Sequence, residues 1–184
     1  AILRHFADPR VGMASGAIWQ RLSGRPVPER YASYHVPGAA KFYRRECFQA
    51  IGGLRPLYGW DILDETMARY HGWRTLSDPR IVLWHHRLQG ASLGLLRGRM
   101  VWGWGAYAVG SHPLFALIRG FFRMTERPYL IGGLAFLWGF FSAYWRPEIQ
   151  RLEDPALIRY LRREQLYRLL HGNRLPPLGL QEAT

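Results

Sequence analysis

The chain has 184 residues, of which 48% are hydrophobic, and it carries a formal net charge of +12. This length and hydrophobic content exclude an intrinsically disordered protein and predict a folded domain with a real core. The charge comes almost entirely from arginine, because Lys41 is the only lysine. An arginine excess suits partners that carry phosphate, such as nucleic acid, anionic lipid headgroups or a nucleotide, although a GC-rich genome also enriches a protein in arginine.

The single cysteine, Cys47, limits the chemistry that the chain can perform. One cysteine excludes an internal disulfide and a zinc site built from cysteines, and it predicts a reducing compartment. Because Cys47 lies in an apolar-flanked stretch of helical character, we expect a small buried side chain there rather than a nucleophile.

The first residues are typical of the interior of a domain. The chain begins at Ala1 without a methionine or a signal peptide, and Ile2, Leu3 and Phe6 have helical spacing. We therefore expect this chain to be a fragment of a larger protein.

Helices and strands are predicted to alternate over residues 1–90. A strand over 11–16 and a loop over 23–30 come first, followed by helices over about 44–51 and 62–70 and a strand over 80–86. Glycines at positions 52, 53 and 72 supply the signals that end the two helices. This order predicts an α/β fold.

Residues 91–150 are predicted to form a helical region that associates with a membrane. Ser92 is a candidate cap for its first helix, and the segment 129–145, YLIGGLAFLWGFFSAYW, has no charged residue. Such a length is at the lower limit for crossing a hydrocarbon layer of about 30 Å. A short span, a re-entrant hairpin, an interfacial helix and a buried core helix therefore all remain open.

Two features of this apolar segment favour membrane contact. Tyr129 and Trp145 at its ends are residues that prefer the membrane interface. Arginines that suit anionic headgroups surround it, at positions 119, 123, 127 and 146. The remaining residues, 151–184, are predicted to form a charged helical tail.

The stretch GWDILDE contains three carboxylates, Asp61, Asp64 and Glu65. Asp61 is a candidate N-cap for a helix that begins at Ile62, with Asp64 at its third position. Acids in a first helical turn are also favoured by the helix dipole. Helix capping therefore accounts for all three acids without any catalytic role.

The surroundings of these acids resemble a known pattern. A Gly-Ala turn (Gly38, Ala39) precedes a helix that contains Arg44, Arg45, Phe48 and the ending Ile51-Gly52-Gly53. The acidic stretch then opens a helix that ends in Gly72-Trp73-Arg74, and the next strand ends in His85-His86. Over roughly residues 5–90 this order resembles the second half of a family 2 glycosyltransferase domain of the GT-A type, from membrane-associated bacterial enzymes.

The resemblance implies an inverting sugar transfer. A carboxylate takes the proton from an acceptor hydroxyl while that oxygen attacks the anomeric carbon, and the nucleotide diphosphate leaves. The position of the family's base falls on Asp61, but Trp60 stands where the family has a glutamate, so Asp64 and Glu65 are kept as second candidates. The implied substrate-binding residues are Gly38, Ala39, Arg44, Arg45 and Trp60.

A divalent metal, Mg or Mn, is also implied by the resemblance. One histidine of the pair His85-His86, with His85 preferred, is expected to face it. The family holds this metal mainly with an Asp-x-Asp motif, which does not occur in this chain. The chain alone is therefore expected to be an incomplete enzyme.

The expected partners follow from the same resemblance. They are a nucleotide-diphosphate sugar donor, a glycan or lipid-linked acceptor and membrane lipid, with no nucleic acid. The expected setting is exopolysaccharide, cell-envelope or glycolipid synthesis at the cytoplasmic face of the bacterial inner membrane. The Gln-x-x-Arg-Trp motif of processive synthases is absent, which favours single additions over polymerisation.

A different class of function also fits the composition. A basic membrane-surface or nucleic-acid-binding module without catalysis would use arginines to bind phosphate and aromatic residues to stack on bases. The aromatic residues cluster in apolar runs such as VWGWGAY and FLWGFF instead of alternating with basic residues, which disfavours nucleic acid. A structural membrane adaptor is a third interpretation, and enzymatic activity alone separates it from the first.

Overall fold

The computed structural model describes residues 1–22, 25–86 and 94–177. It is mixed α/β, as predicted, and it divides into two compact units. The first unit comprises residues 1–54, 63–88 and 177–184, and the second comprises residues 55–62 and 89–176.

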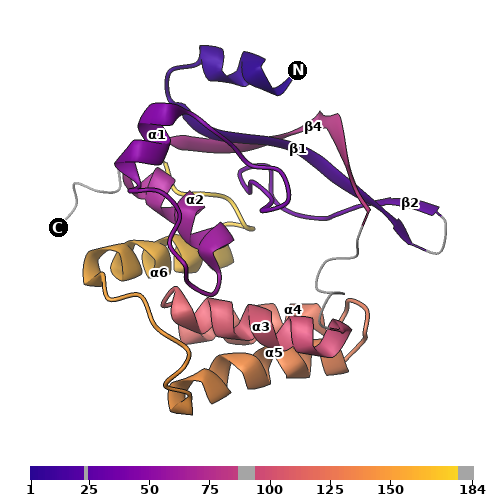
Figure 1. Ribbon diagram of the computed structural model, residues 1–184. Helices are drawn as coiled ribbons and strands as arrows, with labels where there is room; N and C mark the ends of the chain where they lie inside the picture. The colour runs from indigo at the N-terminus through magenta and orange to yellow at the C-terminus, as the bar shows by residue number, and fades with distance from the viewer. Residues whose placement is uncertain (23–24, 87–93, 178–184) are drawn as a thin grey trace. The chain divides into compact units, whose positions relative to one another are not determined.

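A four-stranded mixed sheet organises the first unit (Figure 1). Its central strand, β1 (Val11–Leu22), pairs antiparallel with β2 (Arg25–Pro28) and with β3 (Phe42–Tyr43). Strand β4 (Arg74–His85) pairs with β1 in parallel. Parallel neighbours need a long crossover, and here the chain between β1 and β4 supplies it.

An irregularity in the β1–β4 pairing explains why residue 16 is a glycine. The register shifts between Gly16 and Ala17, which pair with Asp78 and Val82 respectively. A Cβ atom on Gly16 would lie 2.2 Å from the carbonyl oxygen of Ile81, so only glycine allows the bulged backbone to come this close.

Helices of the first unit precede β1 or lie in the crossover between β1 and β4. They are the 3₁₀ helix η1 (Ile2–Ala7), α1 (Arg45–Ala50) and most of α2 (Trp60–Tyr70), whose first turn belongs to the second unit. Gly52 and Gly53, with φ of 71° and 77°, follow α1 in the left-handed region, as predicted for its end. Cys47 is fully buried in this unit, which confirms its predicted role as a small core side chain.

Two local predictions were wrong. The predicted loop over 23–30 contains strand β2, because this segment turns back and pairs with the end of β1. Helix α2 begins at Trp60 and not at Ile62, so Asp61 lies inside the first turn and is not the N-cap. Both long strands also extend beyond their predicted limits, since pairing along β1 continues past the apolar core.

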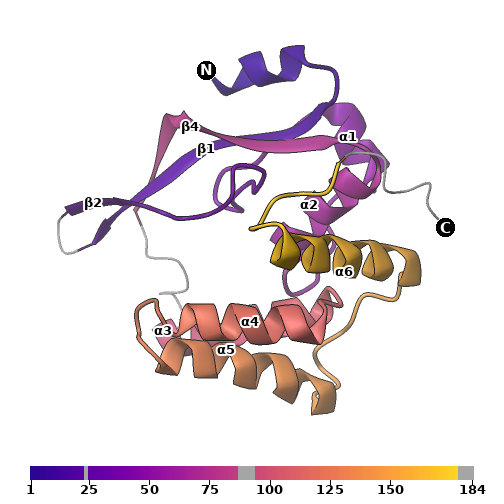
Figure 2. The same ribbon diagram turned by 180° about the vertical axis from the view of Figure 1, so that it is seen from behind.

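The second unit is helical (Figure 2). Its elements are α3 (Leu95–Ala108), α4 (Pro113–Arg123), α5 (Ile131–Ser142), η3 (Ala143–Trp145) and α6 (Pro155–Leu170). The Asp154 side chain caps α6 by accepting a 3.0 Å hydrogen bond from the Leu157 amide. The predicted cap Ser92 lies outside the described residues.

Glycines bring the helices of this unit into backbone contact. A Cβ atom on Gly103 of α3 would lie 2.2 Å from the Phe136 carbonyl oxygen of α5, and one on Gly139 of α5 would lie 2.2 Å from the Met100 carbonyl oxygen. Close approach through small residues is typical of helices that associate without a large hydrophobic driving force. In the described residues, no helix has both the length and the apolar character that a bilayer span requires.

Candidate functional site

The three acids of α2 have different surroundings, although they lie within five residues. Asp64 and Glu65 are each only 2% exposed, whereas Asp61 is half-buried in the first turn. Burial of ionised carboxylates is costly unless each one is paired and hydrogen-bonded. The partners of the two buried acids therefore decide what these acids do.

Asp64 is held by two side chains from the segment before α1. The Lys41 Nζ atom donates to its Oδ1 atom at 2.6 Å, and the Tyr43 hydroxyl donates to its Oδ2 atom at 2.5 Å. Burial raises the pKa of Asp64, and the Lys41 charge and these two hydrogen bonds oppose that rise. Burial and the neighbouring Asp64 also raise the pKa of Tyr43, so the hydroxyl keeps its proton as a donor.

Glu65 is the centre of a second set of contacts. Its Oε1 atom accepts a 2.9 Å hydrogen bond from the Val36 amide and lies 3.0 Å from His35 Nδ1. Lys41 and Arg69 each place a cationic nitrogen 3.4 Å from its oxygens. Burial alone would raise the pKa of Glu65, but the hydrogen bond and charge of His35, with the charges of Lys41 and Arg69, lower it to about 2.

This buried network positions the loop that precedes β3. Besides the contacts to Val36 and Lys41, the Ser77 hydroxyl of β4 donates to the His35 carbonyl oxygen at 2.6 Å. The loop then makes a turn closed by a 3.0 Å hydrogen bond from the Ala40 amide to the Pro37 carbonyl oxygen, as the Gly38-Ala39 pair predicts. Asp64 and Glu65 thus hold the backbone on both sides of Gly38 and Ala39.

Sequence reasoning missed the partners of these acids: His35, Lys41 and Tyr43. One signal was present, because Lys41 is the only lysine among 25 basic residues. Its compact ammonium group lies within 3.4 Å of both buried carboxylates.

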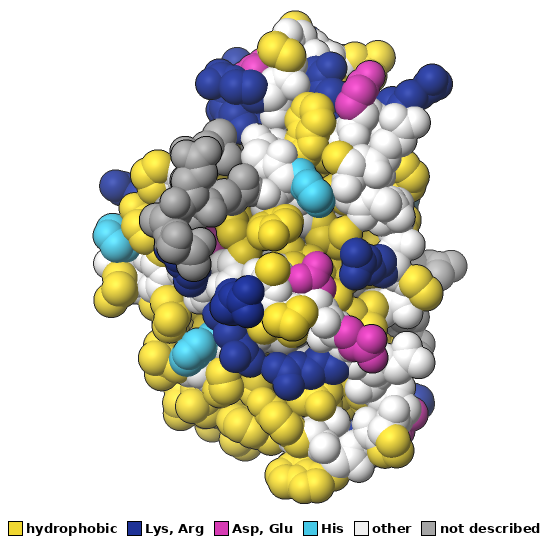
Figure 3. Space-filling model, turned by 90° about the vertical axis from the view of Figure 1, so that its left-hand side faces the viewer, with side chains coloured by type: hydrophobic (Ala, Val, Ile, Leu, Met, Phe, Trp, Pro, Cys, Tyr) yellow, Lys and Arg dark blue, Asp and Glu magenta, His cyan; other side chains and the backbone are white. Residues whose placement is uncertain are grey.

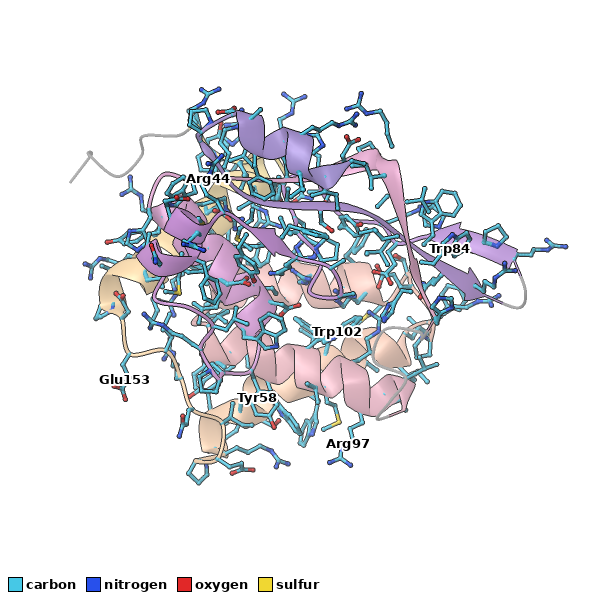
Figure 4. All side chains as sticks on the ribbon, turned by 45° about the horizontal axis from the view of Figure 1, so that its top comes forward. Arg44, Tyr58, Trp84, Arg97, Trp102 and Glu153 are labelled. Carbon is cyan, nitrogen blue, oxygen red and sulfur yellow. The ribbon has the colours of Figure 1, made fainter. Side chains whose placement is uncertain are left out.

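The predicted substrate-binding arginines have separate surroundings. The Arg44 guanidinium donates to the carbonyl oxygens of Phe6, Asp8 and Val11 and so ties η1 to β1 (Figure 4). Arg45 is exposed at the first position of α1. Trp60 is 38% exposed at the start of α2.

The predicted metal-binding histidines lie at the end of β4. His86 is exposed, whereas the His85 side chain is 29% exposed and its Nδ1 atom lies 3.5 Å from Glu29 Oε1. Burial raises the pKa of Glu29, against the lowering influence of His85. In the register of the sheet His85 pairs with Gln20, and Glu29 donates its amide to the Ile18 carbonyl oxygen at 2.8 Å.

Three polar atoms near this strand end are buried without a hydrogen-bond partner in the described part of the chain. They are His85 Nδ1, Glu29 Oε1 and Gln20 Oε1. Such atoms are unusual in folded proteins and call for an explanation. Glu29 and Gln20 were not predicted, because Glu29 was placed in a loop and only the strand pairing brings it near His85.

The imidazole nitrogen of His85 and a carboxylate oxygen of Glu29 are atoms of the kinds that coordinate divalent metals such as Mn. Across the described ranges, however, no group of three or more His, Cys, Asp or Glu side chains is arranged to hold a metal ion. Within these ranges His85 and Glu29 are therefore two candidate ligands only, and they do not form a metal site by themselves.

The second unit has a feature of another kind. Helix α4 exposes Leu114, Ile118, Phe121 and Phe122, and helix α5 exposes Ile131, Leu134, Trp138 and Phe141. Their spacing places each set on one side of its helix, and the opposite sides pack together through Gly120 and Gly133. We call these eight side chains the apolar face, and Figure 3 shows hydrophobic side chains gathered over this helical region beside Lys and Arg side chains.

Comparisons with known proteins identify no relative of this chain. No family model matches the sequence, and neither a curated protein nor a solved structure matches it at a significant level. The functional argument therefore depends on the residues of this chain.

Proposed function

We propose that the first unit, with the first turn of α2, is the acceptor-side part of an inverting glycosyltransferase of the GT-A type, family 2. The exposure of the three acids carries this proposal. Asp64 and Glu65 are enclosed by Lys41, Tyr43 and His35, whereas Asp61 remains half-buried in the first helical turn. Asp61 is therefore the acid of this group that an acceptor hydroxyl can reach.

Each group of the site has a role in this proposal. Asp61 accepts the proton of the acceptor hydroxyl while the oxygen bonds to the anomeric carbon and the nucleotide diphosphate leaves. Asp64 and Glu65 are positioning residues that hold the turn at Gly38 and Ala39, where small side chains let a sugar approach the backbone. A divalent cation held by His85, Glu29 and ligands from elsewhere would offset the negative charge on the departing diphosphate.

The test is sugar transfer by the intact protein that contains this chain. Asp61→Asn is expected to lower kcat by a factor of about 10² to 10⁴, the usual contribution of a general base. Transfer is measured from a panel of nucleotide-diphosphate sugars to glycan and lipid-linked acceptors. Asp154→Asn is the matched control and is expected to leave kcat unchanged, because asparagine caps α6 as well as aspartate does. If Asp61→Asn leaves sugar transfer undiminished, Asp61 is not the base.

A second candidate function is binding of the second unit to a membrane surface. The apolar face supports it, because side chains as large as Phe122 and Trp138 are 65% and 64% exposed there. Contiguous apolar surface of this kind marks a site of association. Lipid is the proposed occupant, because exposed Tyr129, Trp145, Arg127 and Arg146 flank α5 in the sequence and suit the headgroup region.

Two leucines provide a matched test of membrane binding. Leu134 is 55% exposed on the apolar face, and Leu170 is 81% exposed at the end of α6. Leu134→Ser is expected to weaken sedimentation of the chain with phospholipid vesicles roughly tenfold, since a leucine side chain is lost from the buried surface. Leu170→Ser is expected to leave binding unchanged, and equal effects of the two substitutions would argue against the apolar face.

A further inference from the structure

A group of charged side chains lies at the end of α4, next to the apolar face. Arg123 Nη1 and Arg99 Nη1 lie 3.0 Å and 3.1 Å from the same oxygen, Oε2 of Glu126. Arg99 Nη2 also donates to the Arg127 carbonyl oxygen at 2.9 Å. We call Arg99, Trp102, Arg123 and Glu126 the arginine cluster.

The aromatic member of the cluster holds both guanidinium groups. The Arg99 and Arg123 Cζ atoms lie 4.5 Å and 4.4 Å from the centre of the Trp102 ring. Both arginine side chains are mostly buried, with exposed fractions of 12% and 14%. Cation–π contacts of this geometry are stronger in a partly desolvated position than on an open surface, so the two charges are fixed in place.

The cluster has more positive than negative charge. Glu126 is one carboxylate between two arginines, and the charge of Arg119 also acts on Arg123. Burial, followed by the repulsion of Arg119 and Arg99, lowers the pKa of Arg123 to about 9. In addition, Arg123 Nε is buried without a hydrogen-bond partner in the described residues. An anion at the exposed edge of the cluster would offset the excess positive charge.

The residues that neighbour the arginine cluster in the sequence favour an anion that carries apolar chains. Arg123 follows Phe121 and Phe122, which are 60% and 65% exposed. Past Glu126, the chain continues into Tyr129 and Leu130, which are 60% and 65% exposed. The cluster thus has exposed apolar residues close to it in the sequence on both sides, and a phospholipid likewise combines a phosphate with acyl chains.

We propose that the arginine cluster binds the phosphate of an anionic phospholipid while the apolar face enters the same leaflet. The inference depends on the membrane contact proposed for the second unit. Arginine favours phosphate because its planar fork donates two parallel hydrogen bonds. A zwitterionic lipid is bound less well, because its quaternary ammonium group adds a further positive charge beside Arg99, Arg119 and Arg123.

The experiment is sedimentation of the full chain with two kinds of vesicle. One contains phosphatidylcholine alone, and the other contains equal parts of phosphatidylcholine and phosphatidylglycerol. Arg123→Gln is expected to weaken binding to the anionic vesicles at least about fivefold, and the exposed Arg163→Gln of α6 less than about twofold. Binding to the neutral vesicles is expected to change little with either substitution.

A second variant covers the case in which Arg123→Gln fails to fold. Arg99→Lys keeps the charge and the contact with Trp102 but removes the planar fork, and it is expected to weaken anionic binding about two- to threefold. If only diffuse electrostatic attraction held the chain to the vesicles, Arg99→Lys would bind the anionic vesicles as the wild type does, and Arg123→Gln and Arg163→Gln would weaken this binding equally. Either result overturns the phosphate site. Far-UV circular dichroism confirms that each variant is folded.

Three further outcomes separate the two proposals. Equal binding of the wild-type chain to both vesicles overturns the phosphate site and leaves the membrane contact standing. Binding to neither vesicle overturns both. Inorganic phosphate is added as a competitor of the vesicles, and sodium chloride of equal ionic strength is the control. If phosphate reduces vesicle binding more than chloride does, the cluster is assigned to the free ion instead of the lipid.

Discussion

The two units place polar and apolar side chains in opposite ways. The first unit buries a lysine, two carboxylates and an arginine in one network around α2, whereas the second unit leaves the eight side chains of the apolar face exposed. In the first unit each buried charge has partners that come from other segments. In the second unit glycines and the buried Phe136 and Phe140 form the contacts between helices, and the apolar face lies outside these contacts. The exposed apolar face is the feature on which the proposed membrane contact of the second unit depends.

The largest effect is expected from breaking the buried network of the first unit. Lys41→Met retains most of the side-chain volume but leaves Asp64 and Glu65 as neighbouring buried acids without the ammonium group between them. Removal of one partner from a buried ion pair costs about 3–5 kcal/mol. Urea unfolding of the wild-type and variant chains gives this difference.

Arg163→Met is the control for Lys41→Met, because it also removes a positive charge but from an exposed position of α6. Its effect is expected to stay within about 0.5 kcal/mol. A loss of less than about 1 kcal/mol for Lys41→Met would mean that water or another partner compensates the acids, and the contrast between the units would weaken.

An intermediate effect is expected from the helix contacts of the second unit. Gly139→Ala places a methyl group 2.2 Å from the Met100 carbonyl oxygen, and backbone cannot move aside as a flexible side chain can. Overpacking of this kind costs about 1–3 kcal/mol, which exceeds the gain of about 1 kcal/mol that alanine provides over glycine in a helix. Thermal unfolding followed by circular dichroism measures the net loss.

Gly132→Ala of the same helix is the matched control. Its Cβ atom would lie 3.3 Å from Pro128 Cδ, where a small shift of the ring makes room. Its effect is expected to remain within about 1 kcal/mol. Equal losses at both positions would show that helix propensity, and not close backbone approach, determines the use of glycine here.

The smallest effect on stability is expected at the apolar face. Leu134 contributes little to the core because it is 55% exposed, and Leu134→Ser is expected to change the free energy of unfolding by no more than about 0.5 kcal/mol. The same substitution is expected to weaken vesicle binding, as proposed above. A large loss of stability would show that Leu134 supports the fold, and the opposition between the two units would no longer hold at this helix.

Local signals were sufficient for the fold class and for most of the elements, but not for strand β2 or for the site. Glycines after α1 and the alternation of helix and strand predicted the α/β class, and the apolar flanks of Cys47 predicted its burial. The same signals placed Glu29 in a loop, because a four-residue edge strand has too short a pattern to be recognised alone. The cluster of Arg99, Trp102 and Arg123 was equally hidden, since its members come from two helices and an ion pair with Glu126 joins them.

The sequence by itself determined the α/β class, the C-terminal ends of α1 and α2 and the positions of the three acids along α2. Tertiary structure alone decided which of these acids is buried: Asp64 and Glu65 meet Lys41, Tyr43 and His35, which lie at least 20 residues away in the sequence, whereas Asp61 remains half-exposed. The physical reason is that helix propensity and capping depend on neighbours within one turn, while the state of a carboxylate depends on burial and on charges that only folding brings near.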